Sequence, residues 1–212
     1  MLRKILIKHI ALIRSICMCL AGALQGTKFS PFATVSATGK IHLHAKASVK
    51  KAILNAQDGE IILAKGAWLN NGVEINSTNR VFVGEGTTIQ RNTTINGEVS
   101  IGTECLLAPN VFLSSTSHVH DYIPGVSIRE QERKISKTEF IKLYNKPITI
   151  GNDVWIGANV VIMPGVEIGS HVIIGSNSVV NQSIPSGVIA AGVPVRVIKT
   201  RPGFENSKEE KP

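Results

Sequence analysis

An aliphatic side chain recurs at every sixth position along two long stretches of this sequence. The first stretch runs from Val83 to Leu113 and the second from Ile150 to Val180, and neither misses a position. A looser form of the spacing comes earlier in the chain, at Leu43, Val49, Leu63, Leu69 and Ile75. A period of six matches neither an α-helix nor the two-residue alternation of a long strand. It is typical of short strands joined by turns, in which each strand points one aliphatic side chain into a narrow core.

The residues around the repeat support this interpretation. Gly or Ala directly follows seven of the twelve aliphatic positions in the two stretches, and a small residue there permits a tight turn. Aromatic residues make up only 5% of the chain, so Val, Ile, Leu and Ala must fill the core. We therefore predict an all-β fold, a left-handed parallel β-helix over residues 28–199. A polar tail over residues 200–212 is predicted to be disordered.

The positive charge of the chain is concentrated at its N-terminal end. The formal net charge is +8, yet residues 1–51 hold nine Lys or Arg and no acidic residue, so the remainder carries a balance of −1. A basic end on a near-neutral body indicates a surface tether or a partner contact, and we expect no nucleic acid to bind. The cysteines, Cys17, Cys19 and Cys105, have no zinc-binding or disulfide-framework spacing, which favours the reducing cytoplasm.

Residues 1–27 are predicted to form an amphipathic helix. At 100° per residue its basic side chains fall within one arc of roughly 140°; they are Arg3, Lys4, Lys8 and Arg14. Two interpretations stay open for residues 1–25. They lie peripherally on the inner, anionic face of the cytoplasmic membrane, or they pack against the domain or a neighbouring subunit. A signal peptide or a spanning helix is less favoured, because charged residues interrupt the apolar run.

A long polar segment separates the two stretches of the repeat, which are out of phase with each other. Compact domains rarely carry a loop longer than about 15 residues unless the loop has a function. This segment, residues 114–147, opens with His118, His120, Asp121 and Tyr122. Histidine is well suited to act as a general base near neutral pH, so the loop is a candidate catalytic element. The alternative is that both histidines are solvated loop residues.

Four motifs lie within Ile101–Lys199: I-G-T-E-C-L-L-A-P-N-V, S-H-V-H-D-Y, K-P-I-T-I-G-N-D-V-W-I-G-A-N-V-V-I-M-P-G-V-E-I-G and I-P-S-G-V-I-A-A-G-V-P-V-R-V-I-K. Together they resemble the hexapeptide-repeat acyltransferases, in particular the maltose/galactoside acetyltransferase-like branch and its surface-polysaccharide O-acetyltransferase relatives. The resemblance implies a homotrimer with active sites between subunits. It also implies acetyl-CoA as the co-substrate and no bound metal.

The resemblance further implies roles for particular residues. The catalytic base maps onto His118, with His120 as the fallback, and the backbone N–H that polarises the thioester carbonyl maps onto Ala158. Contacts to acetyl-CoA map onto Trp155, Gly157, Ser176, Asn181, Gln182 and Arg196. Candidate acceptor-binding residues are Asn92, Asp121 and Tyr122. The pair Asn181-Gln182 stands where many relatives have Thr-Lys, which removes one expected phosphate-facing charge.

The leading functional hypothesis is acetyl-CoA-dependent O-acetylation of a sugar in a bacterial surface polysaccharide or its precursor. N-acetylation of an aminosugar nucleotide is a close alternative. Two alternatives belong to other classes: a non-catalytic β-helix scaffold, and a γ-type carbonic anhydrase built on the same fold. The latter requires three histidines on zinc, and the six histidines of this chain lack the spacing that such enzymes use.

Overall fold

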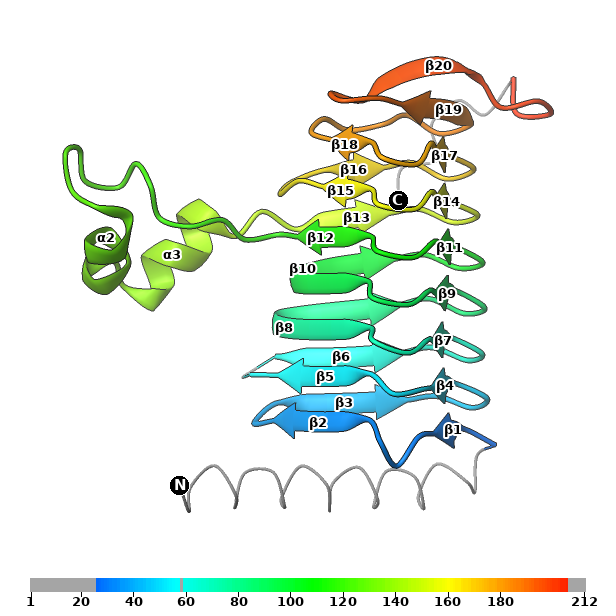
Figure 1. Ribbon diagram of the computed structural model, residues 1–212, viewed down its shortest axis with the longest axis horizontal. Helices are drawn as coiled ribbons and strands as arrows, with labels where there is room; N and C mark the ends of the chain where they lie inside the picture. The colour runs from blue at the N-terminus through cyan, green and yellow to red at the C-terminus, as the bar shows by residue number, and fades with distance from the viewer. Residues whose placement is uncertain (1–25, 58, 206–212) are drawn as a thin grey trace.

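The chain winds into a stack of coils that share one axis (Figure 1). This computed structural model describes residues 26–57 and 59–205 of the 212-residue chain. Within these residues, neighbouring coils pair through parallel strands that line three faces of the stack. The predicted left-handed parallel β-helix is therefore confirmed.

We name the faces A, B and C in the order in which each coil crosses them. Face A holds short strands and ends in the antiparallel strand β20: β1 (Lys28–Phe29), β4 (Ser48–Val49), β7 (Trp68–Leu69), β9 (Thr88–Ile89), β11 (Leu106–Leu107), β14 (Trp155–Ile156), β17 (Ile173–Ile174), β19 (Val188–Ala191) and β20 (Arg196–Thr200). Face B holds β2 (Thr34–Ala37), β5 (Ile53–Ala56), the first halves of β8 (Glu74–Val83) and β10 (Thr94–Ile101), β12 (Phe112–Ser114), β15 (Val161–Ile162) and β18 (Val179–Val180). Face C holds β3 (Lys40–Leu43), β6 (Glu60–Leu63), the second halves of β8 and β10, β13 (Ile148–Ile150) and β16 (Glu167–Ile168).

The core consists of aliphatic columns that run along the axis behind each face. All twelve positions of the two clean repeat stretches are at most 2% exposed. The strand register places these side chains above one another, so that Ile89 pairs with Leu107 and Leu107 with Ile156. Full burial of a side chain of this size stabilises a fold by roughly 1.5–3 kcal/mol. The columns therefore hold the stack together.

The looser spacing before Val83 has a geometric cause. Leu69 pairs with Ile89 and Ile89 pairs with Leu107, so the coil that ends at Ile89 is longer than the coil that follows it. The extra length lies at the corner between faces B and C, where β8 has 10 residues and β10 only 8. Because a regular coil consists of three periods of six, the longer coils break the phase of the sequence without changing the fold.

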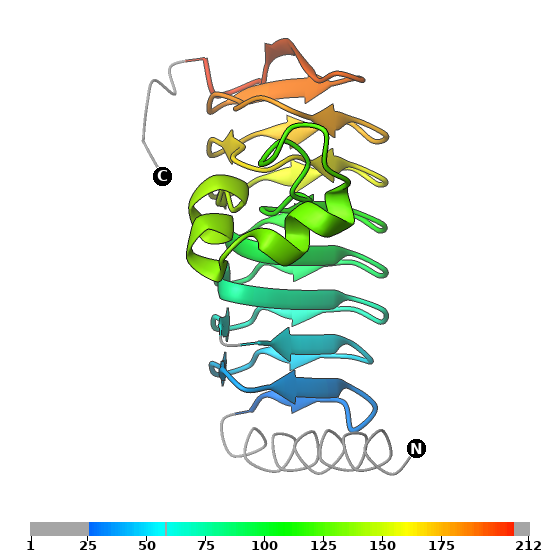
Figure 2. The ribbon, with the colours of Figure 1, turned by 90° about the vertical axis from the view of Figure 1, so that its left-hand side faces the viewer.

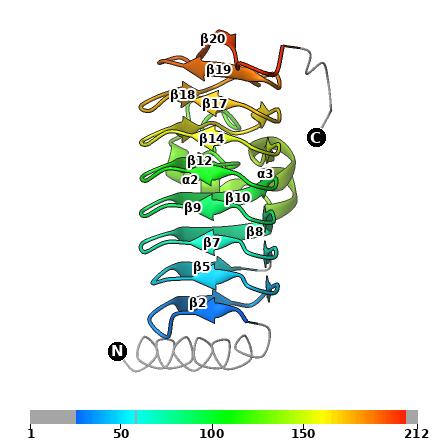
Figure 3. The ribbon, with the colours of Figure 1, turned by 90° about the vertical axis from the view of Figure 1, so that its right-hand side faces the viewer.

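The break in phase after Leu113 disappears in the folded chain. On face C, Val83 pairs with Ile101, Ile101 with Ile150, and Ile150 with Ile168. One continuous column thus joins residues on both sides of the long polar segment. Viewed from the side opposite this segment, the coils stack without interruption (Figure 3).

Glycines stack where the chain turns from face C to face A. A Cβ atom on Gly102 would lie 2.5 Å from the carbonyl oxygen of Gly151 in the next coil. No side chain fits at that distance, so this corner requires glycine because consecutive coils approach each other backbone against backbone.

Residues 115–147 leave the stack at the corner between faces B and C and project to one side (Figures 1 and 2). We call this segment the excursion. The sequence predicts a loop here, but the structure forms two short helices, α2 (Ile128–Lys134) and α3 (Lys137–Tyr144). A capping box starts α3: the Ser136 hydroxyl accepts from the backbone N–H of Glu139, and the Glu139 carboxylate accepts from that of Ser136. The pattern S-K-T-E already carries this signal in the sequence.

The C-terminal tail is ordered further than predicted. Arg201 donates to the Asp153 carboxylate at 2.8 Å, and the Phe204 ring stacks on His171 with 4.4 Å between ring centroids. The prediction of disorder is therefore wrong for residues 200–205, because contacts with distant coils hold them in place. Residues 206–212 lie outside the described part of the chain.

The predicted N-terminal helix lies almost entirely outside the described residues, which begin at Gly26. None of the helices that the structure does describe has the length and hydropathy needed to cross a membrane.

Candidate active site

Two adjoining cavities open where the excursion leaves and rejoins the stack. We name them the His118 cavity and the His120 cavity after the histidine that lines each one, and their volumes are about 740 and 630 Å³. Ser117, Met163 and Pro164 line both cavities. The His118 cavity is bounded by strands β10, β12 and β15 of face B and by both helices of the excursion.

His118 is the better placed of the two candidate bases. Its side chain is 77% exposed, and its Nδ1 lies 2.5 Å from Oε1 of Glu132, which also lines the cavity. When Nδ1–H donates to this carboxylate, Nε2 is left without a proton and can accept one from a bound acceptor. A histidine that is oriented by a carboxylate in this way can serve as a general base. The pair is therefore a candidate catalytic unit.

A buried glutamine holds the segment that carries both histidines. Gln131 is only 2% exposed, and its side-chain amide donates to the carbonyl oxygens of Val126 and His120 at 2.7 and 3.3 Å. Its Oε1 accepts from the backbone N–H of Ile123 at 2.9 Å. Gln131 and Glu132 were missed at the sequence level, because both depend on a helix that the pattern did not predict.

His120 lies in the other cavity and has different partners. Its Nδ1 is 2.9 Å from the backbone carbonyl oxygen of His118, and its ring meets Tyr144 edge-on at 6.2 Å between centroids. Its Nε2 lies 3.9 Å from the Asp121 carboxylate. The sequence left the choice between His118 and His120 open, and the structure separates the two rings into neighbouring cavities.

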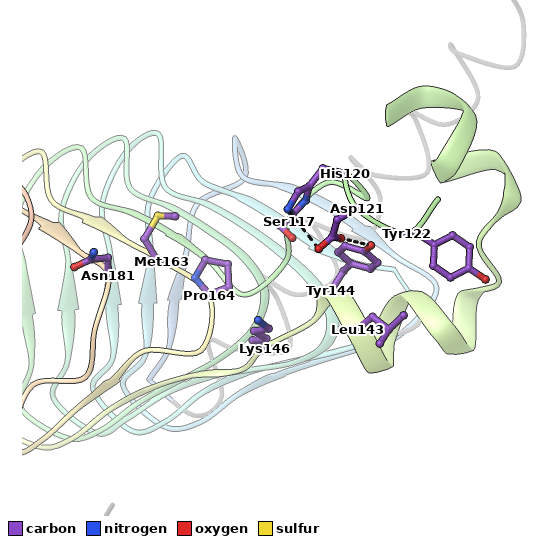
Figure 4. Close-up of a pocket in the computed structure, with 10 residues that line it drawn as sticks. All are labelled: Ser117, His120, Asp121, Tyr122, Leu143, Tyr144, Lys146, Met163, Pro164 and Asn181. Atoms are coloured by element: carbon purple, nitrogen blue, oxygen red, sulfur yellow. Dashed lines mark hydrogen bonds and ion pairs between the residues drawn. The ribbon is translucent and has the colours of Figure 1, made fainter. Parts of the chain in front are cut away.

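Asp121 and Tyr144 form a polar contact in the His120 cavity (Figure 4). The Tyr144 hydroxyl donates to Oδ1 of Asp121 at 2.6 Å, and this hydrogen bond lowers the pKa of the Asp121 carboxyl and raises the pKa of the Tyr144 phenol. Tyr122, a predicted acceptor-binding residue, lies further out, where its hydroxyl donates to Glu139 at 3.0 Å. That hydrogen bond raises the pKa of Tyr122.

We expect the Tyr144→Phe variant to raise the pKa of Asp121 toward its ordinary value of 3.8, because the carboxylate loses its main donor. The native hydrogen bond lowers the pKa of Asp121. The bond therefore stabilises the folded state at pH values above the pKa that this carboxyl has in the unfolded chain. This stabilisation is lost as pH falls through the folded pKa. NMR titration of the Asp121 side chain in both proteins measures the effect, and an unchanged Asp121 pKa in the variant would contradict it.

The residues predicted to contact acetyl-CoA do not converge on one cavity within a single chain. Trp155 stands 52% exposed on face A, whereas Asn181 lines the His120 cavity. The Ala158 N–H donates to the Ser176 hydroxyl at 3.2 Å, and Gly157, which comes just before Ala158, is buried. Further along the chain, the side chains of Gln182 and Arg196 both donate to the backbone carbonyl of Val195, at 3.2 and 2.7 Å.

Asn92, a candidate acceptor-binding residue, lies at a turn. It adopts a left-handed φ of 58°, and its amide donates to Oδ1 of Asn110 in the next coil at 3.3 Å. It lines neither of the two cavities, whereas Asn96 on β10 lines the His118 cavity. Asn96 was missed because its place at the cavity depends on the pairing of β10 with β12, after which the excursion leaves the stack.

Comparison with known proteins agrees with the architecture. Residues 147–182 match the family model described as bacterial transferase hexapeptide (six repeats). The galactoside O-acetyltransferase of Escherichia coli (strain K12) is 40% identical over 139 residues, which is 65% of this chain and 62% of that protein. Over these aligned residues the chain is similar to the bacterial transferase hexapeptide family. The WbbJ protein of the same organism, provisionally named a lipopolysaccharide biosynthesis O-acetyl transferase, is 38% identical over 104 residues, 48% of this chain and 50% of WbbJ.

A solved structure of a hexapeptide transferase family protein from Anaplasma phagocytophilum shares the fold of this chain. Its TM-score is 0.59 at 16% sequence identity, and the alignment covers 81% of this chain and 86% of that one. The chain spans less than two thirds of the length of the curated relatives described above. The family model covers β13 to β18 and does not reach His118.

Residues 26–57 and 59–205 contain no group of three or more His, Cys, Asp or Glu side chains that could hold a metal ion. The described cysteine, Cys105, is buried, and burial raises the pKa of its thiol.

Proposed function

We propose that the chain transfers an acetyl group from acetyl-CoA to a sugar hydroxyl. The observation that carries this proposal is the contact between His118 and Glu132 at the wall of the His118 cavity. Two curated relatives named as O-acetyltransferases, one for galactosides and one for lipopolysaccharide biosynthesis, support the choice of a sugar acceptor. A histidine that is oriented by a carboxylate suits proton removal from a neutral hydroxyl.

His118 acts twice in the proposed reaction. Its Nε2 takes the proton of the acceptor hydroxyl while that oxygen attacks the carbonyl carbon of the acetyl thioester. The carbon–sulfur bond then breaks, and His118 passes this proton to the departing sulfur of CoA. Glu132 stabilises the imidazolium between these two steps, because its carboxylate lies against Nδ1. Protons balance over the cycle, and the products are the acetyl ester and free CoA.

The negative charge that builds on the thioester oxygen requires a hydrogen-bond donor. We propose the backbone N–H of Ala158 for this role, with the incoming oxygen taking the place of the Ser176 hydroxyl. His118 follows β12, at the corner after face B, whereas Ala158 follows β14, at the corner before face B. Because the two groups sit at different corners, we propose that His118 of one subunit works with Ala158 of a neighbour in a homotrimer.

The direct test supplies purified full-length protein with acetyl-CoA and a set of acceptors that includes galactosides and aminosugars. We expect thiol release that depends on a sugar acceptor, together with a sugar product heavier by one acetyl group. Thiol release and mass spectrometry measure these two quantities. Transfer to amines alone would replace O-acetylation with N-acetylation, and the absence of transfer to every acceptor would refute the proposal.

A further inference from the structure

Two outward-facing columns of side chains run along face B toward the His118 cavity. The strand register aligns Ser36, Asn55, Asn76, Asn96 and Ser114 in one column. It aligns Thr34, Ile53, Glu74, Thr94 and Phe112 in the other. Asn96, Ser114 and Phe112 at the upper end of the columns line the cavity, so the surface leads directly to His118.

The asparagines of the first column form a directed chain of hydrogen bonds. The amide of Asn55 donates to Oδ1 of Asn76 at 3.3 Å, and the amide of Asn76 donates to Oδ1 of Asn96 at 2.9 Å. Asn76 also donates to Glu74 at 3.0 Å. The chain of donors ends on the amide of Asn96, which has no acceptor among residues 26–57 and 59–205 and borders the cavity. Successive bonds polarise one another, so the terminal amide is a good donor to an oxygen in the cavity.

The second column adds a mixed polar and apolar surface beside the amides. Phe112 is 41% exposed at the cavity, and Thr94 lies directly below it in the register. Glu74 is the only charged side chain in the two columns between β2 and β12. Amides and hydroxyls beside an aromatic ring match a sugar, which has hydroxyls at its edges and C–H groups on its faces. A polyanionic chain would be repelled by Glu74.

The spacing of the coils matches a chain of sugars. Neighbouring strands in a sheet lie about 4.8 Å apart, which is close to the length of one pyranose ring along a glycan. We propose that β5, β8 and β10 bind a neutral glycan chain that lies along the axis, with its reacting residue in the His118 cavity. This inference rests on the proposed function and deepens it, because it makes the acceptor an oligosaccharide or polysaccharide rather than a single sugar.

The test measures binding apart from catalysis. Full-length protein carrying His118→Ala is titrated by calorimetry with the monosaccharide, disaccharide and hexasaccharide of neutral galactan, glucan and mannan series. We expect affinity to rise with chain length in at least one series. Adding Asn76→Ala should lower the affinity for the hexasaccharide by up to about tenfold, because the substitution deletes one amide of the hydrogen-bonded column. Gln90→Ala is the matched control, because Gln90 accepts a similar inter-coil bond from Asn70 outside the two columns.

Each outcome either supports or overturns the proposed glycan-binding surface. A gain with length that Asn76→Ala reduces and Gln90→Ala retains supports the glycan-binding surface. Equal affinity for all lengths, no binding of any neutral series, or a gain that Asn76→Ala leaves intact overturns it. Acetyl transfer by the protein with intact His118 is assayed in parallel. Chain binding without transfer would refute the proposed activity alone, and transfer to single sugars without a length effect would refute the surface alone.

Discussion

In the His118→Ala variant we expect kcat for acetyl transfer to fall by about 10²- to 10⁴-fold, because the variant loses its general base. The imidazole is 77% exposed at the cavity wall and contributes no core packing, so the melting temperature should stay near that of the parent protein. Initial rates of CoA thiol release at saturating acceptor and acetyl-CoA measure the effect. Thermal denaturation of the same preparations checks the fold.

Two further variants make this result specific. Glu132→Gln keeps the shape of the side chain but removes the charge that orients and stabilises His118, so its rate should fall between those of the parent and His118→Ala. His120→Ala should stay closer to the parent, because His120 lines the neighbouring cavity and bonds to a backbone carbonyl. Loss of activity in His120→Ala together with full activity in His118→Ala would reverse the assignment.

The scaffold could be predicted from the sequence because the information is local and repeated. Each period of six encodes one buried aliphatic side chain, and a residue such as Ile156 occupies the same environment as Leu107 one coil earlier. The longer coils of the N-terminal part were harder to see. Their additional residues lie at one corner and carry no core position.

The site could be predicted only in part because its geometry is not local. The break in the repeat pointed to the segment that carries His118, but Glu132, which contacts His118, lies on the helix α2 within that segment. The excursion's few apolar residues gave no clear helical period, and only the capping box at Ser136 signalled a helix. Asn96 shows the same limit, since it faces the cavity only because β10 pairs with β12, after which the excursion leaves the stack.

The position of Ile101 explains how the excursion is tolerated by the fold. This side chain is fully buried on face C between Val83 of the preceding coil and Ile150, which lies in the first strand after the excursion. After so long a segment, the next strand must pair with its neighbours in the correct register. The column through Ile101 supplies that register by packing one aliphatic side chain against the next.

The Ile101→Ala variant should therefore lower the free energy of unfolding by about 2–5 kcal/mol, because it leaves a cavity in the column where the two halves of the sequence meet. Urea unfolding at one fixed protein concentration measures the change and keeps any subunit association constant. Ser100→Ala is the matched control: Ser100 lies on the same strand, points outward and is exposed, so its effect should stay within about 0.5 kcal/mol. Equal effects of the two substitutions would mean that the return of the chain is held by the excursion itself rather than by the core column.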